Sequence, residues 1–351
     1  MKILHVHDFF AIGNSRYGYD MCKLLARRGH EVHILAGVGK DGPSDGEIID
    51  GVLFHTYPYG FGLGDISFAR WAIRNNKKLF EDVYIKNGID IIIFNQPLCF
   101  YGVTRSKISK IIPKIYNMHS LWGIEWQIAN NYSGSKNTAF RKLIANINVG
   151  LRNRIEKKAF VEVDAIMMLS HFMREQLLGH YPSISPNKLF VISGAVDIDK
   201  FHPITAVNDL MRSAGIDTDK KLILTVRRLV PRMGIGNLIR AMPAIRREIR
   251  DVSLVIGGDG PLRKSLEELS LSLGCSDCIR FIGYVSDEKL PSLYSTANLF
   301  VLPTKELEGF GLVTIEAMAC GTPVMATPIG GIPEILGEFD KDMLFEGTEH
   351  N

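Results

Sequence analysis

The chain has 351 residues, of which 46% are hydrophobic and 23% charged, and its formal net charge is only +3. This composition excludes a disordered or fibrous protein, and no apolar run approaches the ~20 residues of a membrane-spanning helix. Five scattered cysteines are too few for a disulfide framework, and the pair Cys275 and Cys278 lacks the second pair that a structural zinc site needs.

The N-terminal segment has the pattern of a first β-strand. His5, His7 and Asp8 interrupt its apolar run, which argues against a secretory signal and for a cytoplasmic protein. Beyond it, short runs rich in Ile, Val and Leu alternate with amphipathic stretches of helical period. Runs of this kind are typical of parallel strands covered on both faces, so the alternation predicts an α/β protein with doubly wound, Rossmann-like sheets.

Two series of strands are expected, because one hydrophobic core seldom serves so long a chain. The first comprises Ile3–His7, Glu31–Ala36, Ile91–Phe94, Lys114–Met118, Ala165–Leu169 and Leu189–Ile192. The second comprises Lys221–Val226, Ser253–Ile256, Ile279–Ile282, Leu299–Leu302 and Pro323–Ala326. Between them lies SGAVDIDKFHPITAV, which predicts domains at 1–199 and 200–351. Ligands bind beyond the carboxyl ends of such strands, so we expect the domains to face a central cleft that holds the site.

A basic stretch of helical period lies in the first domain. Residues 1–199 hold 24 Lys and Arg against 18 Asp and Glu, whereas the remainder holds 17 against 20. Two interpretations stay open: a solvated helix face, or a surface that contacts anionic lipid head groups or an anionic acceptor. Nearby, Trp122 and Trp126 either pack in the core or stack on an acceptor sugar. The basic residues of the stretch AFRKLIANINVGLRNRIEKKAF are Arg141, Lys142, Arg152, Arg154, Lys157 and Lys158.

The segment TKELEGFGLVTIEAMACGTPVMATPIGGIPEI carries the densest pattern in the second domain. Glu308 to Leu312 form a glycine-bearing turn that opens a helix predicted at Val313–Ala319. The amide groups of a helix N-terminus suit a phosphate, and glycines allow a ligand to approach the backbone. Glu308 and Glu316 are eight residues apart, slightly over two helical turns, so both carboxylates are expected on one side, where they could bind hydroxyl groups. Spacing alone leaves open a helix with a merely acidic first turn.

This segment resembles the donor site of family 4 of the retaining glycosyltransferases, which have the GT-B fold. The family's E-x7-E motif is present as Glu308 and Glu316 within EGFGLVTIEAMACGTPV. The resemblance implies that Glu308 binds hydroxyl groups of the donor sugar as a catalytic residue and that Glu316 binds the ribose. It also implies that the amides of Phe310, Gly311 and Leu312 hold sugar and phosphate.

The resemblance extends over nearly the whole chain. IGNSRYGYDMCKLLARRGHEV is similar to the family's glycine loop and the following helix, which places Gly13 near the donor phosphates and puts Ile12 where the family has its first glycine. His119, in YNMHSLWG, matches the active-site histidine beside the donor sugar. Without the resemblance, a histidine at a strand end is more often structural.

VRRLVPRMGIGNLIRA resembles the family's arginine and lysine that neutralise the donor pyrophosphate. Arg228 takes the arginine position, and Met233 stands where the lysine is expected. A thioether cannot donate a hydrogen bond to phosphate, so Arg232 is a candidate replacement. Further on, IGGDGPLRKSLEEL and FIGYVSDEKLP imply that Gly258 lies near the nucleotide and that the backbone of Val285 contacts the base.

The resemblance implies a retaining, metal-independent hexosyltransferase that moves a sugar from a nucleotide-diphosphate donor to a carbohydrate or lipid-linked acceptor. Polysaccharide or glycolipid biosynthesis is the expected setting, in the cytoplasm and at the inner face of the membrane, with peripheral membrane contact through the basic N-terminal domain. We expect no cofactor besides the nucleotide sugar, no metal ligand and no nucleic-acid partner. Family members continue well past GGIPEI, so we expect the second domain to be truncated at Asn351.

Three alternatives differ in class. The first is a nucleotide-sugar-binding protein without turnover, a pseudoenzyme or accessory subunit, which Met233 and Ile12 favour. The second is a nucleotide-sugar epimerase on the same fold, which the complete EGFGLV motif disfavours. The third is a dinucleotide-dependent dehydrogenase, for which FAIGNSRYG supplies only a partial glycine pattern.

Overall fold

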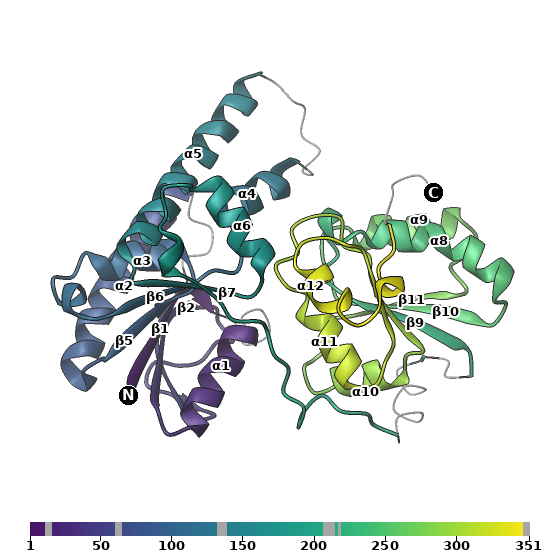
Figure 1. Ribbon diagram of the computed structural model, residues 1–351, viewed down its shortest axis with the longest axis horizontal. Coiled ribbons are helices and arrows are strands. Elements are labelled where there is room, and N and C mark those ends of the chain that lie inside the picture. The colour runs from purple at the N-terminus through teal and green to yellow at the C-terminus, as the bar shows by residue number, and fades with distance from the viewer. Residues whose placement is uncertain (11–15, 60–64, 132–138, 206–214, 217–218, 347–351) are drawn as a thin grey trace. The chain divides into compact units, whose positions relative to one another are not determined.

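The computed structural model describes residues 1–351 apart from 11–15, 60–64, 132–138, 206–214, 217–218 and 347–351 (Figure 1). By its contacts the chain divides into two compact units. Unit 1 comprises Met1–Met168 and Arg174–Ile192, and unit 2 comprises Leu169–Met173 and Ser193–Asn351. The main division, after Ile192, therefore falls seven residues before the predicted boundary after residue 199, and unit 2 also includes Leu169–Met173.

Unit 1 is built on a sheet whose strands, among the described residues, run in the order β3-β4-β2-β1-β5-β6-β7-β8. All neighbours are parallel except β3 and β4. The order reverses between β1 and β5, because β2 and β4 continue to one side of β1 and β5 to β8 to the other. The strands are β1 (Lys2–Phe10), β2 (Glu31–Val38), β3 (Ile48–Ile49), β4 (Val52–Pro58), β5 (Ile91–Phe94), β6 (Lys114–Asn117), β7 (Ala165–Met168) and β8 (Leu189–Val191).

Helices cover both faces of this sheet. In Figure 1, α1 lies on one side of the strands and α3, α5 and α6 lie on the other. Side chains of β1, β2, β4 and α1 form one hydrophobic cluster, in which Phe10, Ile34 and Phe54 are fully buried. The helices are α1 (Arg16–Arg27), α2 (Asp65–Asn87), α3 (Pro97–Thr104), α4 (Trp122–Asn131), α5 (Ala139–Glu162) and α6 (His171–His180), with short 3-10 turns at Ile108–Ile111 and Pro186–Lys188.

Unit 2 has a parallel sheet whose described strands run in the order β11-β10-β9-β12-β13. This order reverses between β9 and β12, with α8 and α9 on one side of the sheet and α10 and α11 on the other (Figure 1). The strands are β9 (Lys221–Val226), β10 (Val252–Gly257), β11 (Ile279–Gly283), β12 (Leu299–Leu302) and β13 (Val324–Ala326). The helices are α8 (Ile235–Glu248), α9 (Arg263–Ser272), α10 (Leu290–Thr296), α11 (Leu312–Ala319) and α12 (Ile332–Leu336), with 3-10 turns at Pro231–Met233 and Lys341–Met343.

The predicted fold class, two α/β units with doubly wound parallel sheets, is confirmed. Each predicted strand is present within two or three residues at its ends. The sequence prediction lacked β3 and β4. The run of β4, VLFHTYP, carries His55 and Thr56 in its second half, so it does not have the uninterrupted apolar pattern on which the prediction relied.

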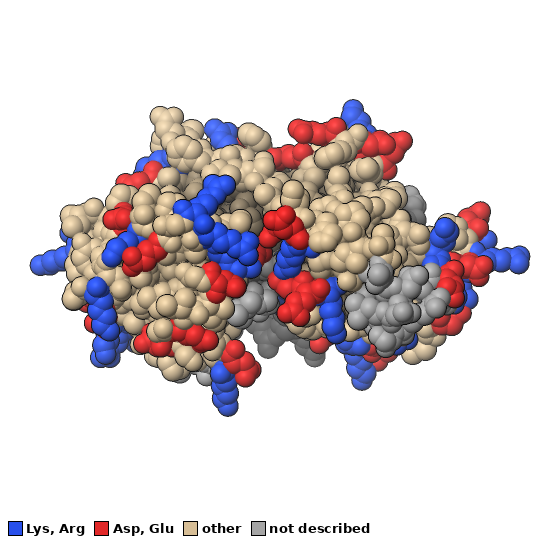
Figure 2. Space-filling view, turned by 90° about the horizontal axis from the view of Figure 1, so that it is seen from below, with Lys and Arg blue, Asp and Glu red and all other residues tan. Residues whose placement is uncertain are grey.

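Charged side chains of both signs share the surface. On the face shown in Figure 2, Lys and Arg lie among Asp and Glu, so the basic excess of residues 1–199 does not form one continuous region there. None of the helices in the described part of the chain is both long and apolar enough to cross a membrane.

Candidate functional site

The candidate site of unit 2 lies where the strand order reverses. The neighbours β9 and β12 are parallel, with Leu299 opposite Ile223 and Phe300 opposite Leu224, so their carboxyl ends meet at one edge of the sheet. Arg227 and Arg228 follow β9, and the segment 303–311 follows β12. A reversal of this kind is the usual place for a ligand in an open α/β sheet, because the two following loops diverge and leave a crevice.

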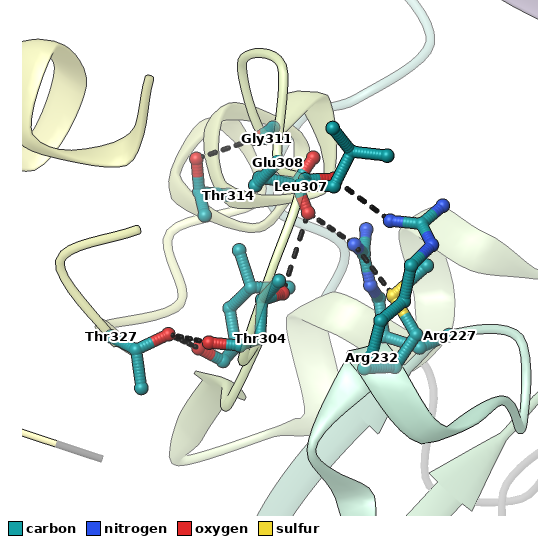
Figure 3. A network of polar contacts seen from close by, with 10 residues as sticks. Arg227, Arg232, Thr304, Leu307, Glu308, Gly311, Thr314 and Thr327 are labelled. Atoms are coloured by element: carbon teal, nitrogen blue, oxygen red, sulfur yellow. Dashed lines mark hydrogen bonds and ion pairs between the residues drawn. The ribbon is translucent and has the colours of Figure 1, made fainter. Parts of the chain in front are cut away.

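An ion pair joins the segments that follow these two strands. Nη2 of Arg227 donates to Oε2 of Glu308 and also lies 3.1 Å from Sδ of Met233 (Figure 3). The side chains of Arg227 and Glu308 are only 11% and 12% exposed. Oγ1 of Thr304 is 3.4 Å from the same carboxylate oxygen, so both contacts use one oxygen of Glu308.

The backbone around Glu308 is held by tight approaches. Leu307 has a φ of +58°, and the amide of Gly331 donates to the carbonyl of Glu308 at 3.1 Å. Gly330 has a φ of +67°, and a Cβ there would lie 1.7 Å from the same carbonyl oxygen. Only glycine fits at residue 330, so the turn after β13 fixes the position from which the Glu308 side chain extends.

Helix α11 begins beside this carboxylate. Its N-cap is Gly311, which has a φ of +93° and no side chain to cap the first amides. The backbone amide and the hydroxyl of Thr314 both donate hydrogen bonds to the carbonyl of Gly311, at 2.8 and 2.7 Å. Phe310 is buried beneath the turn. The amides at the start of α11, with the positive end of the helix dipole, therefore suit an anionic group, as predicted for Phe310, Gly311 and Leu312.

The two glutamates of the motif do not share a helix face. Glu308 precedes α11 by several residues, so the expectation that two helical turns align it with Glu316 is wrong. Glu316 lies within the helix, is 7% exposed, and accepts a hydrogen bond of 3.1 Å from the hydroxyl of Tyr294 in α10. The glycine turn therefore separates two carboxylates with different partners.

Arg228, Arg232 and Gly258 lie in segments that follow the strands at the same edge of unit 2. Arg228 is exposed, and its side chain forms no hydrogen bond or ion pair with the residues that the structure describes. Met233 is buried, and Nη1 of Arg232 donates to the carbonyl of Leu307 at 2.8 Å (Figure 3). Gly258 follows β10, and a Cβ there would lie 1.9 Å from the carbonyl oxygen of Arg227.

Val285 follows β11 and packs close to the neighbouring turn, with its Cγ2 3.0 Å from where a Cβ on Gly257 would lie. Gly13 lies outside the described residues.

Within the described ranges, no group of three or more His, Cys, Asp or Glu side chains could hold a metal ion. The pair Cys275 and Cys278 is buried in the hydrophobic core of unit 2, where the Cys278 thiol donates to the Cys275 carbonyl at 3.3 Å.

A second polar cluster lies in unit 1, where β1, β5 and β6 end side by side. Oδ1 of Asn95 accepts hydrogen bonds from Nε2 of His119 at 3.3 Å and from Nδ2 of Asn117 at 3.1 Å. Nδ2 of Asn95 donates to Nε2 of His7 at 3.2 Å. This assignment places the proton of neutral His119 on Nε2, since the amide oxygen can only accept, and leaves Nδ1 as an acceptor.

Desolvation lowers the pKa of both histidines, which favours their neutral forms. His7 is buried, and this burial, followed by the charges of His5 and His119, puts its pKa well below the usual value. His119 is exposed on one side, yet the protein packed around the imidazole lowers its pKa as well. Neutral imidazoles can exchange hydrogen bonds with sugar hydroxyls without adding charge to the site.

Sequence reasoning missed Arg227, Asn95 and His7. A signal for the last two was present, because HVHDFF, IIIFNQ and KIYNMHS each place polar residues at the end of a buried strand. Arg227 had no such signal, because it is adjacent to Arg228 and only the tertiary structure shows which arginine faces β12.

The sequence also left open whether Trp122 and Trp126 pack in the core or stack on an acceptor sugar. Both indoles pack on the buried guanidinium of Arg152, at 5.1 and 4.6 Å, so they belong to the packing of α4 on α5.

The two Rossmann-like units agree with two family models, which define a protein of the glycosyltransferase class. Residues 11–200 match the family described as Glycosyltransferase Family 4, and residues 207–351 match Glycosyl transferases group 1. The chain belongs to glycosyltransferase family 4.

Relatives and solved structures agree with this membership. The chain is 31% identical over 195 residues to a GDP-mannose-dependent alpha-(1-6)-phosphatidylinositol monomannoside mannosyltransferase of Mycolicibacterium smegmatis. This match covers 54% of this chain and 50% of that protein. It is 30% identical over 342 residues to one subunit of the phosphatidylinositol N-acetylglucosaminyltransferase of Arabidopsis thaliana, covering 96% of this chain and 69% of that protein. The matches to the first relatives thus span about half of their length or less. A sucrose-phosphate synthase of Thermosynechococcus elongatus has the same fold, with a TM-score of 0.75 at 23% identity over 95% of this chain and 84% of that chain.

Proposed function

We propose that this protein is a retaining, metal-independent glycosyltransferase that moves a sugar from a nucleotide-diphosphate donor to a carbohydrate or lipid-linked acceptor. The observation that carries the proposal is the set of groups at the edge of unit 2 where β9 and β12 end. There, the buried carboxylate of Glu308, the exposed guanidinium of Arg228 and the start of α11, which has no side-chain cap, lie around the edge where the strand order reverses. A sugar diphosphate combines the two chemistries that these groups bind, hydroxyl groups and anionic oxygens.

Each group has a role in the proposed reaction. Glu308 accepts hydrogen bonds from hydroxyls of the donor sugar, and Arg228 with the first amides of α11 neutralises the diphosphate as its bond to the anomeric carbon breaks. Positioning and stabilisation of the leaving group then supply most of the rate enhancement. His119 of unit 1, whose Nε2 is held by Asn95, keeps Nδ1 as an acceptor for a sugar hydroxyl. The acceptor hydroxyl attacks the anomeric carbon on the face from which the diphosphate leaves and passes its proton to the departing phosphate oxygen, so the anomeric configuration is retained.

The nucleotide part of the donor fits the rest of this edge. Glu316 binds the ribose hydroxyls, and the hydroxyl of Tyr294 holds its carboxylate in place. The turn at Gly258 and the backbone at Val285 follow β10 and β11, so they lie progressively further from β12 along the sheet. This order agrees with a nucleotide whose phosphates lie near the end of β9 and whose base lies toward the end of β11.

Calorimetry and product analysis test this function. Titration with UDP, GDP and ADP should show one nucleoside diphosphate that binds, and the matching nucleotide sugar should release the diphosphate in the presence of an acceptor. Excess EDTA should leave the rate unchanged, and NMR of the product should show the anomeric configuration of the donor. A protein that binds none of the three nucleotides, or a product of inverted configuration, would contradict the proposal.

One observation favours a second candidate, donor binding without turnover. Met233 is buried at the edge of the site and offers no charge to the leaving diphosphate. In that case a nucleotide sugar binds as tightly as in an active transferase, yet neither transfer nor hydrolysis occurs over hours. The same calorimetric and product assays distinguish the two functions.

We further propose that the acceptor is lipid-linked and that α5 brings the protein to an anionic membrane at the inner face. Leu143, Ile144, Ile147 and Leu151 are all exposed and lie within about 100° of the helix circumference, at 100° per residue. Exposed Arg154 falls in the same sector. In Figure 1 the N-terminal half of α5 projects away from the sheet of unit 1. An apolar stripe continued by basic residues is the pattern of a helix that lies in a membrane interface.

The opposite face of α5 is anchored in unit 1. The carboxylate of Glu156 accepts hydrogen bonds from the amide of Trp122 and the hydroxyl of Tyr181, both at 2.8 Å. Phe160 is fully buried. The names of both relatives described above include phosphatidylinositol, which supports a lipid acceptor.

Flotation with lipid vesicles tests the membrane contact. The protein should float with vesicles of phosphatidylglycerol and phosphatidylcholine and much less with phosphatidylcholine alone, because the contact combines apolar and electrostatic attraction. The double variant Ile147→Glu and Leu151→Glu should abolish flotation. Leu271→Glu, which changes an exposed leucine of α9 in unit 2, is the matched control and should float like the unchanged protein. Equal flotation of all three proteins would refute this role of α5.

A further inference from the structure

The position of the Arg227 side chain has a consequence for donor binding. Its guanidinium group lies between the end of the Met233 side chain and the carboxylate of Glu308 (Figure 3). The proposed site would need a second cation beside Arg228 to balance a diphosphate, and residue 233 cannot supply one. We infer that Arg227 is the second diphosphate-binding cation of this site, and this inference rests on the proposed function.

The first argument is that the guanidinium retains donors for a ligand. Nη2 contacts both Oε2 of Glu308 and the thioether of Met233, so the two contacts share one nitrogen. The buried Nε of Arg227 has no hydrogen-bond partner among the described residues. An arginine presents five N–H groups in a planar fork that matches phosphate oxygens, so an oxyanion could be bound while the contact with Glu308 is kept.

The second argument is that charge around the guanidinium favours an anion. Arg227, Arg228 and the start of α11 contribute positive charge at this edge, whereas Glu308 contributes one negative charge. The ion pair of Arg227 and Glu308 is neutral as a whole, so Arg228 and the start of α11 leave this edge with a net positive charge. Both charges of the pair are largely removed from water, where the attraction of a guanidinium for an oxyanion is stronger than at the surface. Phosphate oxygens are ligands that would restore the balance.

The third argument is that the backbone presents the two arginines to different sides. The amide of Arg227 donates to the carbonyl of Gly257 at 2.9 Å, which continues the pairing of β9 with β10 by one residue. In an extended segment successive side chains point to opposite sides, so Arg227 turns toward the loop after β12 while Arg228 stays exposed. The close approach of Gly258 to the Arg227 carbonyl holds this arrangement.

The arrangement also gives Glu308 a fixed orientation. The contact with Arg227, together with Thr304, holds Oε2, and the other carboxylate oxygen has no hydrogen-bond donor among the described residues. Arg227 thus joins the phosphate part of the donor to the carboxylate that binds the sugar part. A lysine at residue 233 could neutralise phosphate, but its single ammonium group lacks the planar fork that contacts both groups together.

Removing the cation at residue 227 and supplying one at residue 233 tests the inference. In Arg227→Met the affinity for the nucleoside diphosphate that binds the unchanged protein should fall about 10- to 100-fold, the effect of losing a hydrogen bond to a charged group. The double variant Arg227→Met with Met233→Lys returns a cation to the same place and should recover most of this loss. Calorimetry with the nucleoside diphosphate and monophosphate should show that Arg227→Met reduces the preference for the diphosphate, which a purely structural role would leave unchanged.

Controls separate this inference from the proposed function. Arg246→Met removes an exposed arginine whose partner is Asp277 and should leave both affinities unchanged. If Arg228→Met weakens diphosphate binding but Arg227→Met does not, the proposed function stands and the inference is wrong. If the unchanged protein binds no nucleoside diphosphate, both are wrong. Should Arg227→Met fail to fold, Arg227→Gln keeps an N–H donor beside Glu308 but removes the charge, so a reduced preference for the diphosphate is expected and an unchanged preference would overturn the inference.

Discussion

Replacing Gly258 by alanine should destabilise unit 2 and weaken donor binding together. Gly258 has a φ of +110°, and a Cβ there would lie 1.9 Å from the carbonyl oxygen of Arg227. Its amide donates to the carbonyl of Gly283 at 2.6 Å, so the residue is held from both sides by neighbouring strands. Relief of the clash must therefore move the backbone that carries Arg227 and Arg228.

The size of the effect follows from two contributions. A non-glycine residue in this part of φ/ψ space costs about 1–3 kcal/mol. Inserting a methyl group against an immobile backbone oxygen costs about 1–3 kcal/mol more, as other overpacked sites do. The sum of about 2–6 kcal/mol is a large part of the 5–15 kcal/mol that typically stabilises a domain.

Gly274→Ala is the matched control, because Gly274 also has a positive φ, +66°, and a Cβ there would meet nothing within 4 Å. Its cost should be about 1 kcal/mol. Urea unfolding should be followed by hydrogen exchange of the β9 and β10 amides, since all three tryptophans, Trp71, Trp122 and Trp126, lie in unit 1. Tryptophan fluorescence then serves as an internal reference that neither variant should shift.

Equal destabilisation by the two substitutions would refute the reasoning, because it would mean that the Arg227 carbonyl does not limit the space at residue 258. A destabilised Gly258→Ala protein with undiminished affinity for the nucleoside diphosphate would separate the backbone at Arg227 from donor binding.

Two further predictions concern buried polar groups. Burial raises the pKa of Asp8 to about 7 from 3.8, so its folded form binds more protons and the stability of unit 1 should fall as the pH rises from about 4 to 7 and then level off. Asp8→Asn should remove up to about 4 kcal/mol of this fall, measured by urea unfolding with tryptophan fluorescence at several pH values, and an unchanged slope would contradict the burial argument. Tyr294→Phe keeps the packing of a fully buried ring but removes a donor to Glu316, so we expect a loss of about 1–3 kcal/mol in stability and weaker nucleotide binding by calorimetry, whereas retention of both would show that the hydroxyl is dispensable.

The fold could be predicted to a large extent because its signals are local. Uninterrupted runs such as IIIF in β5 and LFVL in β12 mark buried parallel strands by composition alone. The start of α11 was predicted within one residue from the glycine turn before it. The pair β3 and β4 was missed because the pattern of β4 mixes polar and apolar residues, as befits a strand near the edge of a sheet.

The location of the donor site could be predicted from the sequence, but the contacts between its side chains could not. The sequence by itself located the proposed donor site at Glu308 to Glu316, because the glycine turn, the acidic residues and the helix start are neighbours in the sequence. Only the tertiary structure decided which residues meet there. It pairs Glu308 with Arg227 and Glu316 with Tyr294, and it directs Arg232 to the backbone of Leu307. These contacts span 22 to 81 residues of sequence, and they depend on how β9 and β12 pair and on which side of the strand end each side chain leaves, which no local pattern encodes.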